Sequence, residues 1–162
     1  MRAVTNRIVP IEAPSALPED LRSWLPADSV LALATEAADR ITQGPAFPKA
    51  RFEQFDASMM LTLLGYCYAT NRLSSEDVEE AAANEDVVHD TLGFPDAQII
   101  RRFRRAYRPW MLQCLIYILT KAVTEPAEMS RAPGRSGTSA DIVGWSSRKI
   151  QRATLMDVAD AD

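Results

Sequence analysis

Apolar residues recur at every third or fourth position along much of the chain, which is the spacing of one face of an α-helix. Over residues 28–41 this spacing is regular, and Asp28 or Ser29 is the expected N-cap. The segment 52–70 is apolar on nearly every face, so we expect a helix in the middle of a bundle. No segment alternates with the period of a strand, and the pattern therefore predicts an all-α protein.

Two further helices have recognisable starts. Ser74 is expected to cap a short helix with an acidic outer side. Asp96 is expected to cap a helix through Tyr107, after which Pro109 bends or restarts the chain into a helix over 110–123. Residues 85–92 read as another short helix.

The two ends of the chain have weaker patterns. Residues 1–26 are rich in proline and form an irregular N-terminal arm, and residues 27–125 form the helical domain. Residues 126–162 read as a basic flexible linker followed by a marginal helix over 147–158. The expected fold is a compact all-α bundle of about five to six helices, with a helix-turn-helix-like segment and flexible tails.

Composition fits this fold. The chain has 162 residues, of which 47% are hydrophobic and 25% charged, as is typical of a soluble globular protein. Its apolar runs are too short to span a bilayer and no secretion signal opens it, so we expect a cytoplasmic protein without a membrane partner. Cys67 and Cys114 lie in apolar stretches and are expected to be reduced core thiols.

Charge is unevenly distributed along the chain. The net charge is −4, but residues 1–98 carry an excess of acidic side chains and residues 99–152 an excess of basic ones. This asymmetry permits a local basic surface on an acidic protein.

A search for catalytic motifs is mostly negative. The sequence contains no phosphate-binding loop, nucleophile elbow or zinc-protease motif, and its single histidine, His89, has no partner for a metal site. Acidic residues such as Glu76 and Asp77 could bind magnesium, but a solvated helix face is the simpler explanation. We therefore expect no enzyme, cofactor or metal, and an enzyme using these acidic residues and His89 is the least favoured alternative.

The strongest functional signal in the sequence is a cluster of arginines on the helix after Asp96. Several guanidinium groups on one helix can bind phosphate oxygens or guanine edges, and a flexible basic arm adds phosphate contacts. The alternative is that these arginines pair with the acidic helix at 76–80. The expected DNA-binding residues are Arg101, Arg102, Arg104, Arg105, Arg108, Arg131, Arg135, Arg148 and Lys149.

Four sequence blocks occur together in one known family. The blocks are Leu25-Pro26-Ala27-Asp28, Phe55 to Tyr66, Asn71 to Glu79, and Leu92 to Asp96 running into Ile100 to Arg105. With this order and spacing the chain resembles the helical N-terminal domain of DDE-type insertion-sequence transposases. The resemblance implies a domain that helps to bind terminal inverted repeats and to assemble the transposase.

The matching positions are few, and the chain departs from the family at others. The resemblance implies structural roles for Ser74, Pro95, Asp96 and Phe103, and DNA contact only for the arginines; Ser75 and Glu79 also match. Glu76 stands where the family usually has a basic residue, Ser29 where it often has histidine, and Ala97-Gln98 where it has threonine. Too few residues follow Ala122 for an RNase H-like catalytic domain, so we expect the recognition domain without it.

Two functions follow from these observations. The first is a non-enzymatic protein that binds double-stranded DNA, as a truncated or domesticated transposase. The alternative is a protein-interaction module that pairs with itself, with a full-length transposase or with another partner, and regulates it. The acidic net charge and the apolar helix over 110–123 favour the alternative.

Overall fold

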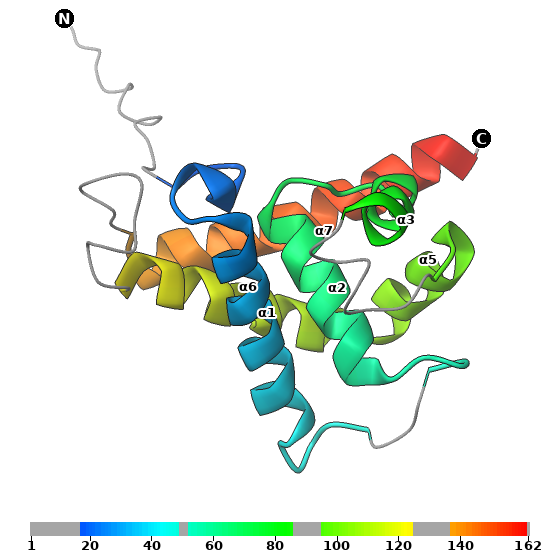
Figure 1. The fold of residues 1–162 in the computed structure, drawn as a ribbon, viewed down its shortest axis with the longest axis horizontal. Helices are drawn as coiled ribbons and strands as arrows, with labels where there is room; N and C mark the ends of the chain where they lie inside the picture. Colours follow the sequence, from blue (N-terminus) through cyan, green and yellow to red (C-terminus); the bar gives the residue numbers. More distant parts are fainter. Residues whose placement is uncertain (1–16, 49–51, 86–94, 125–136, 162) are drawn as a thin grey trace, which may run out of the picture.

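The computed structural model describes residues 17–48, 52–85, 95–124 and 137–161 (Figure 1). Within these ranges the fold is all-α, as predicted, and the only strand-like pairing is an isolated bridge between Phe52 and Phe55. The elements are the 3-10 helix η3 (Leu21–Ser23) and the α-helices α1 (Ala27–Thr42), α2 (Ala57–Ala69), α3 (Ser75–Asn84), α5 (Ala97–Ala106), α6 (Arg108–Thr124) and α7 (Ser139–Ala161).

Helix α2 is the centre of the bundle. Apart from Ser58 and Met59 all of its residues are buried, and α1 and α6 both pack against it. The contact with α6 is close at Gly65, where an added Cβ would lie 2.9 Å from Cys114 Sγ. Cys67 and Cys114 are both free and buried, so the predicted central helix and core thiols are confirmed.

The helix starts follow local side-chain chemistry. Ser74 Oγ accepts a hydrogen bond from the Asp77 backbone N–H at 3.0 Å, and Asp96 Oδ1 accepts one from the Ile99 N–H at 2.9 Å, which confirms both predicted caps. The prediction for α1 is wrong, since Pro26 occupies the N-cap position without a side-chain bond. Helix α1 therefore begins before Asp28.

Helix α2 also starts later than the apolar pattern predicts. The Phe52 and Phe55 backbones exchange two hydrogen bonds of 2.9 Å in a tight turn, and Asp56 then caps the helix through the Ser58 N–H. Phe52 packs edge-on against Phe103 and Tyr107, with ring centroids 5.3 and 5.8 Å apart. The turn thus fixes the position of α5 relative to α2.

The end of α5 and the start of α6 form a sharp corner. Tyr107 ends α5 and its carbonyl accepts the Trp110 N–H at 3.1 Å, so the chain restarts as a helix at Arg108. Pro109 is tolerated because it lies in the first turn of α6, where a backbone N–H has no acceptor within the helix. Arg105 and Arg108 are three residues apart in sequence, but the corner assigns them to different helices, α5 and α6.

Helix α7 differs most from the sequence prediction. In place of a marginal helix over 147–158, it has 23 residues, runs behind α1 and α2 along the bundle (Figure 1), and packs against α6. It buries Ile142, Trp145, Ile150 and Ala153 in the same core as the other helices. Small residues such as Gly144 dilute its apolar pattern, and tertiary packing supplies the stability that its local sequence lacks.

The core also takes in residues before α1. Leu21, Trp24 and Leu25 are buried, and the Trp145 indole of α7 donates a 2.8 Å hydrogen bond to the Pro18 carbonyl. The segments on both sides of the predicted domain therefore share its core. Most of the predicted helix at 85–92 and of the basic linker lies outside the described residues.

Candidate nucleic-acid interface

Helix α5 carries the arginine cluster on an amphipathic scaffold. Ile100 and Phe103 are fully buried, and the Phe103 ring stacks on Tyr107 with centroids 4.4 Å apart. These apolar contacts fix the rotation of α5, because α5 is apolar on one side only and that side packs against its neighbours. The rotation divides the arginines between the interior and the surface.

Arg104 lies inside the protein, although the sequence placed it among the DNA contacts. Its side chain is 6% exposed and forms an ion pair with Asp157, which is 3% exposed and belongs to α7. Ser75 donates to the same carboxylate from its hydroxyl at 2.7 Å and its backbone N–H at 3.0 Å. Arg104 thus joins α5, α7 and the start of α3, and it is removed from the DNA-binding surface.

Tyr68 lies beside this buried pair. Its hydroxyl is fully buried and has no hydrogen-bond partner among the described residues. Burial raises the pKa of Tyr68 to about 12, although the nearby Arg104 guanidinium opposes the shift. The phenol is therefore neutral at physiological pH, and Arg104 and Asp157 carry the only opposed charges of this cluster.

The other four arginines of the cluster lie at the surface. Arg101 pairs with Glu76 of α3 at 3.1 Å, and Arg102 pairs with Glu53 at 2.8 Å. Arg108 has one long hydrogen bond, of 3.4 Å, to the Thr154 hydroxyl. Arg105 is exposed, and its side chain forms no ion pair or hydrogen bond with a described residue.

Arg102 and Arg105 line the same shallow hollow. Phe52, Glu53 and Ala106 complete its walls. An anion in this hollow would meet two guanidinium groups and one carboxylate. The pair between Arg102 and Glu53 is exposed, so it contributes at most about 1 kcal/mol and can be exchanged for a phosphate contact.

The two predicted DNA contacts on α7 have different environments. Arg148 is exposed, but Lys149 is 2% exposed, and the sequence prediction of surface contact is not met for Lys149. Lys149 Nζ donates to the Asn71 side-chain oxygen at 3.1 Å and to the Glu19 carbonyl, and lies 5.0 Å from the centre of the Trp145 ring. Burial lowers its pKa to about 8. Arg131 and Arg135 lie outside the described residues.

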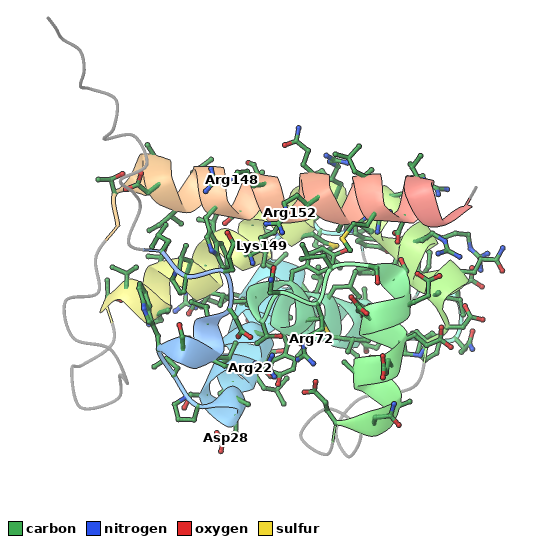
Figure 2. The ribbon with its side chains drawn as sticks, turned by 90° about the horizontal axis from the view of Figure 1, so that it is seen from above. Arg22, Asp28, Arg72, Arg148, Lys149 and Arg152 are labelled. Atoms are coloured by element: carbon green, nitrogen blue, oxygen red, sulfur yellow. The ribbon has the colours of Figure 1, made fainter. Side chains whose placement is uncertain are left out.

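A second group of basic residues, which the sequence interpretation missed, gathers around Lys149. Figure 2 shows the face on which Arg22, Arg72 and Arg152 lie near Lys149. These residues come from η3, from the turn between α2 and α3, and from α7. Each of these arginines has an acidic partner in Asp20, Glu85 and Glu19 respectively. No local motif joins these residues, which come from three separate segments of the chain.

No site for metal or thiol chemistry is found within the described part of the chain. It contains no group of three or more His, Cys, Asp and Glu residues able to hold a metal ion, and His89 lies outside it. Burial raises the pKa of Cys67 and of Cys114 to about 12, so neither is a thiolate near neutral pH. None of the described helices is long and apolar enough to cross a membrane.

Comparison with known proteins adds no relative. No protein-family model, curated protein sequence or solved structure matches the chain. The resemblance to a transposase domain therefore depends on the four sequence blocks alone.

Proposed function

We propose that the protein binds double-stranded DNA without catalysing a reaction, through the exposed arginines of the corner between α5 and α6. The supporting observation is that Arg105 is exposed without an acidic partner among the described residues and shares a hollow with Arg102. Arg108, the first residue of α6, is also exposed, and its only side-chain hydrogen bond to a described residue is the 3.4 Å bond to the Thr154 hydroxyl of α7. The sequence resemblance to the recognition domain of transposases supports the same choice of ligand.

The acidic neighbours of this surface reduce the affinity but leave it accessible. Glu53 and Glu76 compete with phosphate for Arg102 and Arg101, and each exposed pair contributes about 0 to 1 kcal/mol. Proteins bind duplexes non-specifically with Kd values of about 1 to 100 µM at physiological salt, and more tightly as the salt concentration falls. We therefore expect binding in this range at physiological salt and tighter binding at low salt, without a sequence preference.

The test is fluorescence anisotropy with a labelled duplex, using the full chain at several salt concentrations. The informative variant is Arg105→Gln with Arg108→Gln, because both side chains are exposed and neither has an acidic partner in the described structure. Arg104 is left intact, since its substitution would disturb the core. We expect the affinity to fall at least about tenfold and the slope of log K against log salt to decrease by about 2.

The matched control removes two positive charges elsewhere. Arg40 and Lys121 flank the Tyr117 ring on α1 and α6, with cation-to-centroid distances of 5.5 and 5.9 Å. Replacing both by glutamine changes the net charge equally, so it separates local contact from overall charge. Absence of salt-dependent binding by the wild type, or an equal loss in both double variants, would contradict the proposal.

A further inference from the structure

A hollow lies between α6 and α7, which run side by side in opposite directions (Figure 1). Its volume is about 330 Å³, within the range of sites that bind small molecules. Three of its lining side chains are apolar, and the other two are a guanidinium and a hydroxyl. They are Arg108, Pro109 and Leu112 of α6 and Ser147 and Ile150 of α7. Apolar walls with a few polar groups are typical of small-molecule sites between packed helices.

The two polar groups stand at opposite ends of this hollow. The Arg108 side chain reaches the Thr154 hydroxyl of α7. Ser147 precedes Thr154 by seven residues, so it lies about 10 Å away along the same helix. Ile150 lies between them and is 2% exposed, and Leu112 is half-buried opposite it on α6. The hollow therefore has a cation at one end and an apolar floor between the ends.

The cation of this hollow has no counter-charge. Arg108 forms no ion pair with a described residue, and its 3.4 Å hydrogen bond to Thr154 exceeds the usual N–H···O range of about 2.7 to 3.2 Å. Two other hollows of the described structure have acidic side chains in their own walls, Glu53 in one and Glu85 with two residues of α3 in the other. No acidic residue lines the hollow between α6 and α7. Its charge thus calls for an anionic ligand.

We propose that this hollow binds a small molecule that has one carboxylate and an apolar tail. The carboxylate pairs with Arg108, because a guanidinium offers parallel N–H donors that match the two oxygens of a carboxylate. The tail lies along Leu112 and Ile150 toward Ser147, where it covers apolar surface. Arg108 is exposed, so the carboxylate keeps part of its hydration when it pairs there.

The volume of the hollow limits the size of this ligand. An apolar cavity of about 150 Å³ holds one benzene molecule. The hollow has about twice that volume, so it accommodates at most roughly twelve heavy atoms. Octanoate is an acid that fits this limit. For a ligand of this size in a site open to solvent we expect a Kd on the order of 0.1 to 1 mM.

Occupation of the hollow has a consequence for DNA binding, and this part of the inference rests on the proposed function. A bound carboxylate neutralises Arg108, one of the two arginines of the corner without an acidic partner in the described structure. Removal of both arginines is expected to weaken DNA binding about tenfold, so the ligand should weaken it about threefold. By reciprocity, bound DNA should weaken the ligand by the same factor.

Titration of the isotope-labelled full chain with octanoate, followed by the NMR signals of its backbone amides, tests the site. We expect saturable changes around Leu112, Ser147 and Ile150. Octanol has the same tail without the charge and should bind about fivefold more weakly, and Arg108→Gln should reduce octanoate binding to the level of octanol. Octanol binding as tight as that of octanoate, or no saturable change below about 3 mM, would overturn the proposal.

A pair of tryptophan variants tests the location. Ser147→Trp places a large ring in the hollow and should abolish octanoate binding while leaving helicity unchanged, because Ser147 is exposed. Thr120→Trp is the matched control, since Thr120 is also exposed and lies about 12 Å along α6 from Leu112. Undiminished binding by Ser147→Trp, or an equal loss in the control, would place the ligand elsewhere and overturn the assignment.

Fluorescence anisotropy with a labelled duplex tests the consequence for DNA. The full chain is measured with saturating octanoate and with an equal concentration of sodium chloride. Unchanged DNA affinity in a protein that binds octanoate would overturn the coupling. Absence of DNA binding in both solutions would contradict the proposed function instead, and the NMR titration, which contains no DNA, decides the site in either case.

Discussion

Removal of the Asp157 carboxylate is the most direct test of how this fold is held together. The carboxylate neutralises Arg104 inside the protein and accepts two hydrogen bonds from Ser75 at the start of α3. Asp157→Ala leaves the guanidinium charge buried without a counter-charge, which typically costs about 3 to 5 kcal/mol. Because the total stability of a domain is about 5 to 15 kcal/mol, this loss is a large fraction of it.

The expected loss is measured by urea unfolding followed by circular dichroism. A chain of this length should also lose on the order of 10 °C in Tm, at about 2 to 4 °C per kcal/mol. Arg152→Ala on the same helix is the control, because its ion pair with Glu19 is exposed and contributes less than about 1 kcal/mol. The contrast separates the buried pair from the general effect of losing a charge on α7.

A double-mutant cycle shows whether the buried charge is the cause. Arg104→Met removes the charge that Asp157→Ala leaves unpaired, so the double variant should be more stable than Asp157→Ala alone by about 1 to 3 kcal/mol. Additive losses in the double variant, or a loss below about 1 kcal/mol for Asp157→Ala, would refute the reasoning. Either result would mean that the buried charge of Arg104 does not need Asp157 as its counter-charge.

Three further predictions concern packing, pH and capping. Gly65→Ala should cost about 1 to 3 kcal/mol of unfolding free energy by urea denaturation, because its Cβ would lie 2.9 Å from Cys114 Sγ; no loss would mean that α6 shifts freely. Burial lowers the pKa of Lys149 from 10.5 to about 8, so between these pH values the folded state holds fewer protons than the unfolded state. The free energy of unfolding of the wild type, relative to that of Lys149→Met, should therefore rise by up to about 3 kcal/mol from pH 8 to pH 10.5. A difference that does not change with pH would contradict the effect of burial. Ser74→Ala should cost about 1 kcal/mol by thermal unfolding, since it removes the cap of α3, and an unchanged Tm would show that Asp157 suffices there.

The features that sequence reasoning predicted well are local ones. The caps at Ser74 and Asp96 bond the backbone N–H three residues further on, so the necessary partners are visible in a short window. The central position of α2 followed in the same way from apolar residues on every side of one segment. Such features depend on neighbours within one helix turn.

The features that sequence reasoning missed depend on distant partners. Arg104 is buried by a carboxylate 53 residues away, and Lys149 by a carbonyl 130 residues away. In sequence both are ordinary members of a basic segment, and the rotation of α5 and α7 alone decides which cations face inward. The length of α7 was missed for a related reason, because Trp145 and Ile150 become stabilising only against α6 and the chain before η3.

The uneven charge of the sequence has an internal use in this fold. Basic side chains of the second half pair with acidic ones of the first half: Arg101 with Glu76, Arg102 with Glu53, and Arg152 with Glu19. Part of the basic charge that suggested a DNA-binding surface thus forms ion pairs between the two halves of the chain. These exposed pairs are weak. They orient the arginines of α5, and a phosphate group can replace the carboxylate partner at a small cost in free energy. The arginines of this surface therefore differ in what they can contribute: Arg105 and Arg108 have no carboxylate to give up, whereas Arg101 and Arg102 do, and DNA affinity should depend more strongly on the first two.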